Sequence, residues 1–112
     1  MTGGLPADVA IEHVYLVEAT YAPDGAERRA PYRAEHVSRA AELRDRGIVV
    51  EAGAFSDVSA SILIVRAPDA EAALALARDD VYWRNGVWVD LRCRPFGLVV
   101  RPGEVRSPHA TR

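Results

Sequence analysis

Three features of the sequence predict an α+β protein in which helices cover one face of an antiparallel sheet. Two segments repeat apolar residues every three or four positions, as amphipathic helices do. Four other segments are rich in β-branched residues or alternate apolar and polar positions, as strands do. In chain order the segments read strand, helix, strand, strand, helix, strand. This is the order of the ferredoxin-like fold, with four antiparallel strands and two helices on one face.

The first half of the chain predicts a strand, a long loop and a helix. Residues 12–20 form a strand with apolar side chains on both faces, so we expect both faces to be covered. The loop TYAPDGAERRAPY is rich in Pro, Gly and Asp and is long enough to contribute to a site. The helix is expected from Arg33 to Gly47, because glycine is favoured as the left-handed cap. His36 lies on or beside its apolar face. That face consists of Val37, Ala40, Ala41 and Leu43.

Two strands and the second helix follow. Residues 48–55 and 60–66 are rich in β-branched residues and are joined by the turn SDVSA. Asp69 is a helix N-cap signal, and the segment AEAALALAR after it is a strong helix former. We expect this helix to end near Asp79 or Asp80. An acidic side chain would then stand at the end of the helix that its dipole disfavours.

The last strand is expected over residues 87–94, after the exit segment VYWRNG. Alternation predicts one face of Val87, Val89, Leu91 and Cys93 and another of Trp88, Asp90, Arg92 and Arg94. Pro95 should interrupt the ladder or bend it at a sheet edge, and FGLVV could continue the strand beyond the bend. The domain therefore spans residues 12–100. Residues 1–11 are expected to be a flexible lead, and residues 101–112, with His109, a disordered tail.

The composition excludes several classes of function. A formal charge of −2 gives no general attraction to phosphate backbones or anionic lipids, so we expect neither nucleic acid nor a membrane as partner. All 14 basic residues are Arg, which excludes lysine Schiff-base chemistry. One Cys and three His show no metal-ligand spacing, so no metal and no other cofactor is expected. The lone Cys and the absence of a signal or membrane segment predict a cytoplasmic protein.

The uncovered face of the sheet predicts a second subunit. Residues 12–20 and 60–66 carry apolar side chains on both faces, whereas two helices cover only one face. We therefore expect a twofold homodimer that packs sheet against sheet. The alternative is a monomer whose termini fold over the sheet.

His36 is the first candidate for chemistry, because a polar ring beside a buried face needs a hydrogen-bond partner. Arg33, three residues earlier, shares its side of the helix. The alternative is a histidine that only satisfies a backbone carbonyl. The aromatic residues Tyr82, Trp83 and Trp88 could wall a pocket for a flat ring, or serve as core or dimer contacts. His13 is interpreted as a sheet or interface residue and Cys93 as a small buried hydrophobe.

Three short motifs resemble those of the YciI-like family of the dimeric ferredoxin-like α/β-barrel superfamily. They are RAEH at Arg33 to His36, ELRDRG ending at Gly47, and DVYWRNG from Asp80 to Gly86. The resemblance covers about residues 12–100. Arg33 and His36 match the Arg-x-x-His of the family, and Gly47 matches the glycine that closes the helix. The motif after the second helix is matched by Asp80, Tyr82 and Gly86.

Two positions depart from the family pattern: Val81 stands where Pro is usual, and Ala54 follows Gly53 where Pro is common. The resemblance implies a His36–Asp80 pair at the mouth of a cleft between the helices and the sheet. It also implies activities of the dehydrochlorinase or lyase type, without a cofactor, such as a few relatives have in the breakdown of aromatic compounds.

We therefore expect a small cofactor-independent enzyme acting on a small carbonyl or aromatic compound. His36 would be the general acid/base, and Asp80, with Asp79 as the alternative, would orient it. Arg33 would hold a carboxylate or a developing enolate. The expected substrate-binding residues are Arg33, Tyr82 and Trp83. The alternatives are a non-catalytic dimeric module that binds a small ligand and, as a third interpretation, a cofactor-free oxygenase.

Overall fold

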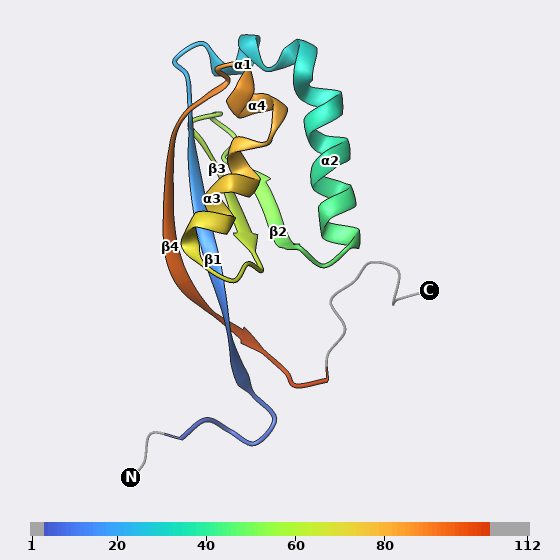
Figure 1. Ribbon diagram of the computed structural model, residues 1–112, viewed down its shortest axis with the longest axis vertical. Helices are drawn as coiled ribbons and strands as arrows, with labels where there is room; N and C mark the ends of the chain where they lie inside the picture. Colours follow the sequence, from blue (N-terminus) through green and yellow to red (C-terminus); the bar gives the residue numbers. More distant parts are fainter. Residues whose placement is uncertain (1–3, 104–112) are drawn as a thin grey trace.

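The computed structural model describes residues 4–103 and shows a four-stranded antiparallel sheet with helices, in the strand order β2-β3-β1-β4 (Figure 1). The strands are β1 (Ala10–Tyr21), β2 (Val49–Ala54), β3 (Ala60–Val65) and β4 (Trp88–Val100). The helices are α1 (Gly25–Arg28), the 3₁₀ turn η1 (Ala30–Tyr32), α2 (Arg33–Asp45), α3 (Ala70–Arg78) and α4 (Val81–Arg84). This α+β architecture is consistent with the predicted ferredoxin-like fold. No described helix is both long enough and apolar enough to cross a membrane.

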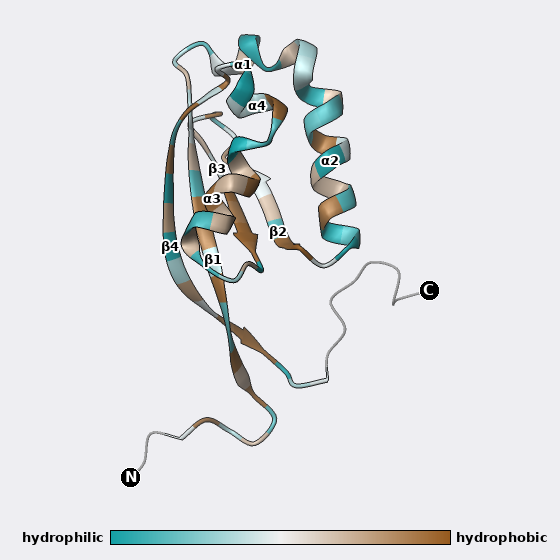
Figure 2. Cartoon of the chain, in the orientation of Figure 1, coloured by the Kyte–Doolittle hydropathy of each residue, from teal (hydrophilic) through white to brown (hydrophobic). Residues whose placement is uncertain are grey.

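The core lies between the sheet and the helices. Helix α3 packs on β1 and β4, and α2 packs on β2. The sheet contributes Val17, Ala19, Leu63 and Val65, and the helices contribute Leu43, Ala73, Ala77 and Tyr82. Figure 2 shows that β3 is largely hydrophobic, whereas α2 is mostly hydrophilic. Helix α2 is therefore attached by few buried side chains.

Helix α2 turns a different face to the sheet from the one predicted. Leu43 is its only buried residue, whereas Val37 is 53% exposed and Ala41 is also exposed. The side that meets the sheet is formed by His36, Ala40 and Leu43, at spacings of four and three. The end of the helix is as predicted: Gly47 has a φ of +78° and follows the last turn as a left-handed cap.

Strand β4 agrees with one of the two predicted alternatives at Pro95 and differs from the prediction near its start. It is an edge strand that continues through Pro95 and FGLVV to Val100, because the missing N–H of Pro95 faces no neighbouring strand on the outer side. Near its start the register shifts: Thr20 lies opposite Asp90, but Tyr21 lies opposite Trp88. Val89 is thus an extra residue that turns Trp88 to the core side, where it is 1% exposed. The prediction that Trp88 lies on the polar face was wrong because a bulge resets the alternation.

The other face of the sheet is not covered by any described helix. Register places Leu16 beside Ile64, and Ile62 lies two residues away on the same side of β3. All three side chains are half-buried, and Phe96 of β4 is 37% exposed on this face. The predicted apolar character of both faces of β1 and β3 is therefore confirmed.

Strands β1 and β4 continue beyond the sheet as a two-stranded ribbon (Figure 1). The first strand begins at Ala10, two residues earlier than predicted, and pairs there with Val100. Residues 101–103 leave the ribbon in a turn. Residues 1–3 and 104–112, with His109 of the expected tail, lie outside the described residues.

Candidate functional site

The site begins where the second long helix is broken and a new turn starts. Helix α3 ends at Arg78, and Asp80 has extended backbone angles and acts as the N-cap of α4. Its Oδ2 accepts a hydrogen bond of 2.9 Å from the backbone N–H of Tyr82. The predicted end of the helix is confirmed, because Asp79 is the C-cap of α3, at the end that disfavours an acid. Asp80, in contrast, stands at a helix start, which favours an acid. Val81 occupies the first position of α4, where Pro is readily accommodated.

The capping carboxylate also meets the histidine of α2. Nδ1 of His36 lies 2.8 Å from Oδ2 of Asp80. Asp80 is 3% exposed, and the His36 side chain is 16% exposed. The side chain of the adjacent Asp79 is 80% exposed, and its Oδ2 lies 3.7 Å from Nη2 of Arg39 rather than against the imidazole. The geometry thus pairs His36 with Asp80 and not with Asp79.

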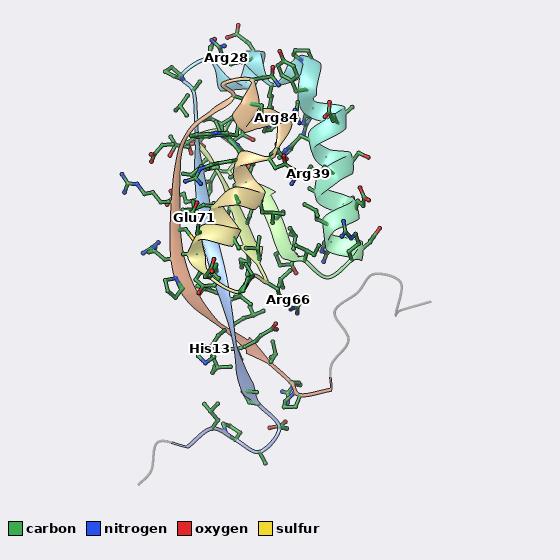
Figure 3. All side chains as sticks on the ribbon, in the orientation of Figure 1. His13, Arg28, Arg39, Arg66, Glu71 and Arg84 are labelled. Atoms are coloured by element: carbon green, nitrogen blue, oxygen red, sulfur yellow. The ribbon has the colours of Figure 1, made fainter. Side chains whose placement is uncertain are left out.

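A second cation from α2 completes the contacts of this carboxylate. Nη1 of Arg39 donates to Oδ1 of Asp80 at 3.1 Å, and Nη2 donates to the carbonyl of Leu76 at 3.1 Å. Figure 3 shows Arg39 reaching from α2 toward α3 and α4. Sequence reasoning missed Arg39, although its position three residues after His36 on one helix was a usable signal.

These contacts decide the charge of Asp80. Burial raises its pKa, but the hydrogen bonds from His36, from the Tyr82 amide and from Arg39 outweigh burial and hold the pKa below its ordinary value. An ionised carboxylate can only accept hydrogen bonds. The Nδ1 of His36 therefore carries the hydrogen that it shares with Asp80, and in the neutral ring Nε2 has the free lone pair.

Two aromatic rings fix the orientation of the imidazole. The His36 ring stacks on Tyr82, with centroids 3.7 Å apart and planes 9° apart. Trp88 meets the imidazole edge-on, at 5.3 Å and 88°. Burial is the main cause that raises the pKa of the Tyr82 hydroxyl, while the charges of Arg29 and Arg33 oppose it. The hydroxyl therefore stays protonated at neutral pH. The Nε1 of Trp88 is buried and has no partner among the described residues.

A cavity of about 220 Å³ lies between α2 and strands β2 and β3, and His36, Tyr82 and Trp88 form part of its wall. Small side chains leave this space: Ala40 faces it from α2, and Ala52, Gly53 and Ala54 face it from β2. The volume is below the usual range for drug-sized ligands, so the cavity fits a compound of about one ring.

The far side of the cavity carries a pair of buried hydroxyls and a guanidinium. Ser61 Oγ lies 3.1 Å from the hydroxyl of Tyr21 in a hydrogen bond. The Cζ of Arg29 lies 5.9 Å from the centre of the Tyr21 ring. Arg33 lines the same cavity. No ion pair joins Arg29 or Arg33 to a carboxylate within the part of the chain that the structure describes.

The predicted site residues are brought together in part. His36, Asp80, Arg33 and Tyr82 all line the cavity, whereas Trp83 is half-buried against the core and is not part of its wall. Sequence reasoning missed Tyr21, Arg29, Arg39 and Ser61 as lining residues. Arg29 lies in the loop that was expected to contribute to a site, but no spacing singled it out.

Two other residues considered from the sequence lie elsewhere. His13 is exposed on the ribbon of β1 and β4, away from the cavity (Figure 3). Cys93 is half-buried on the core side, and burial raises the pKa of its thiol. Among residues 4–103, no three His, Cys, Asp or Glu side chains gather as candidate metal ligands.

Comparisons with known proteins agree with this architecture. The family model of the YCII-related domain matches residues 14–97. One similar solved structure is the 5-chloro-2-hydroxyhydroquinone dehydrochlorinase from Burkholderia phenoliruptrix AC1100, in complex with 2,5-dihydroxybenzoquinone. It has a TM-score of 0.63 and 14% sequence identity, over 74% of this chain and 92% of that chain. The search of curated proteins finds no match. At this identity the structural similarity shows the fold alone.

Proposed function

Because the chain belongs to the YCII-related family, we propose that it is a small cofactor-independent enzyme that uses a His-Asp pair for general acid/base chemistry on a small carbonyl or aromatic compound. One observation carries the proposal: the 2.8 Å contact between His36 Nδ1 and the buried Asp80, beside a cavity of one-ring size. The dehydrochlorinase activity of the similar structure belongs to the same class, which includes isomerases and lyases.

His36 is the group that moves the proton. Asp80 holds the Nδ1 hydrogen, which leaves the Nε2 lone pair available as a base. Nε2 takes a proton from a substrate carbon next to a carbonyl, and the electron pair of the broken C–H bond moves toward the carbonyl oxygen as an enolate. Return of the proton to another atom gives an isomer, and departure of chloride with its bonding electrons gives an elimination. Both outcomes need one positioned base, which supplies about 10² to 10⁴ in rate.

The neighbouring residues hold this arrangement. Arg39 adds to the hydrogen bonds that keep Asp80 ionised and holds its second oxygen, which restrains the carboxylate from rotating away from His36. Tyr82 stacks on the imidazole and, with Trp88, provides a flat wall for a ring. Arg33 contacts the carboxylate or the developing enolate of the substrate. Trp83 acts only through its packing against the core.

The test measures turnover in wild type and in two histidine variants. The probes are 5-chloro-2-hydroxyhydroquinone, followed by chloride release, and small enolisable ketones and lactones in D₂O, followed by loss of carbon-bound hydrogen in NMR spectra. His36→Gln should lower the rate about 10²-fold or more while circular dichroism stays unchanged. His13→Gln is the matched control, because it removes an imidazole that is exposed on the ribbon.

Two results would contradict the enzyme proposal. In one, the wild type releases no chloride and exchanges no hydrogen with any probe, although thermal shift shows that a probe binds. The chain is then a ligand-binding module that uses the same cavity without chemistry. In the other, His36→Gln and His13→Gln have equal rates, so that the imidazole of α2 moves no proton.

We also propose that the protein is a twofold homodimer that packs through the uncovered face of the sheet. The support is the apolar set Leu16, Ile62, Ile64 and Phe96, which no described helix covers. Contiguous exposed apolar surface of this kind marks an interaction site in soluble proteins. A second copy of the chain would cover this apolar face on both subunits, because a twofold dimer uses the same self-complementary surface of each subunit.

A further inference from the structure

The charges that line the cavity are unbalanced. Over residues 4–103, three guanidinium groups, those of Arg29, Arg33 and Arg39, border it, and Asp80 is the single carboxylate in its wall. Arg39 is engaged with Asp80 at 3.1 Å, so the wall leaves two cations without a counter-charge. The chain as a whole has a formal charge of −2, so this positive excess is local to the cavity.

The two guanidinium groups without a carboxylate partner lie in the same part of the wall. Arg29 and Arg33 flank the 3₁₀ turn η1, and both line the cavity, Arg33 as an exposed residue. Arg29 is half-buried and is held near the ring of Tyr21 by a cation–π contact of 5.9 Å. Both charges act on the same hydroxyl, that of Tyr82, whose pKa they lower against the effect of burial.

Apart from His36 and the hydroxyls of Tyr21 and Ser61, the rest of the wall is mainly apolar and aromatic. Leu43, Val49 and Leu63 line it, together with the rings of Tyr82 and Trp88. A ligand that fills such a space has an apolar or aromatic body and one group that is complementary to two cations. Guanidinium groups bind carboxylates and enolates through paired, charge-assisted hydrogen bonds.

From this arrangement we infer that the substrate class is a small anion of single-ring size, whose carboxylate or acidic enol oxygen is bound by Arg29 together with Arg33. Arg29 is thereby a specificity residue that no pattern in the sequence indicated. The inference rests on the proposed function for its link to catalysis, but the binding preference itself can be measured without turnover.

The test compares benzoate with benzamide, which share size and shape and differ in charge. Titration followed by the NMR spectrum of the protein should show benzoate binding at least about tenfold more tightly than benzamide, with shifts at the cavity. Added salt should weaken the binding of benzoate and leave the binding of benzamide unchanged. Arg29→Met and Arg33→Met should each remove most of the preference for benzoate over benzamide.

Arg46→Met is the matched control. It removes the same charge from the exposed end of α2, about 20 Å along the helix from Arg33, and should keep the preference. The inference would be overturned if the two probes bind equally, or if benzoate shows no saturable binding in the millimolar range. It would also be overturned if Arg46→Met loses as much of the preference for benzoate as Arg29→Met and Arg33→Met do. The comparison of benzoate with benzamide uses only the wild-type protein, so it tests the inference even if a variant does not fold. Because none of these results depends on His36, failure here is distinct from failure of the proposed acid/base chemistry.

Discussion

Replacement of the buried Asp80 should destabilise the protein more than replacement of an exposed acid near it, because this one carboxylate makes three contacts. It caps α4 through the Tyr82 amide at 2.9 Å, accepts from His36 at 2.8 Å and pairs with Arg39 at 3.1 Å. Loss of an N-cap costs about 1 kcal/mol. Breaking a fully buried ion pair costs about 3 to 5 kcal/mol. Here Arg39 is 24% exposed and keeps its bond to the Leu76 carbonyl, so we reduce this contribution to about 2 kcal/mol.

Asp80→Ala should therefore lower the free energy of unfolding by about 3 kcal/mol at pH 7. Asp80→Asn should lower it by about 1 to 2 kcal/mol, because Asn caps a helix as well as Asp but carries no charge for Arg39. Urea denaturation followed by tryptophan fluorescence, at one fixed protein concentration, measures both values. Asp79→Asn is the matched control and should cost less than about 0.5 kcal/mol, because Asp79 is 80% exposed.

The same variants give a pH dependence with a defined sign. In the folded state the pKa of Asp80 lies below its ordinary value near 3.8, so its charge stabilises the protein above that pH. As pH falls through the folded-state pKa, the carboxylate is protonated and this stabilisation is lost. The difference in the free energy of unfolding between wild type and Asp80→Asn should be largest at neutral pH and should disappear in the acidic range. A cost of Asp80→Ala below about 1 kcal/mol, or a gap that does not change with pH, would refute the reasoning.

Two further predictions concern the sheet and the cap of α2. Ile64→Glu should convert the proposed dimer to a monomer by light scattering, whereas Val37→Glu, at a position 53% exposed on α2, should leave the mass unchanged; a wild-type monomer would contradict the proposed interface. Gly47→Ala should lower the unfolding free energy by about 1 kcal/mol, because its φ is +78° and the new methyl group meets nothing closer than 3.8 Å. Gly53→Ala has open space and no positive φ, and should be neutral or slightly stabilising; equal costs for the two would argue against a conformational cause.

Local patterns were enough to predict the order of elements. Periodicity and turn residues act over a few positions, and they predicted the four strands, the two long helices and the cap at Gly47. They failed where one residue changed the phase of a pattern. The extra Val89 in the bulge turned Trp88 from the expected polar face into the core, and nothing in the alternation of β4 marks the bulge.

The contacts of the site depend on long-range geometry and were less predictable. His36 and Asp80 are 44 residues apart, so only the resemblance to a family suggested that they meet. Arg39 could have been noticed as the next residue on the face of His36. Arg29 could not, because its role depends on how α1 and η1 fold back over the cavity.

The identity of residue 80 is determined by fold and site together. Its capping position selects a short side chain with an acceptor, which favours Asp, Asn, Ser or Thr. Its contact with Arg39 in a buried setting selects a negative charge, which leaves Asp alone from that group. An Asp selected in this way also holds the Nδ1 hydrogen of His36 at 2.8 Å, although neither the cap nor the ion pair requires it. The contact between Asp80 and His36 is therefore not explained by the stability of the fold, and it is the contact on which the proposed proton transfer depends.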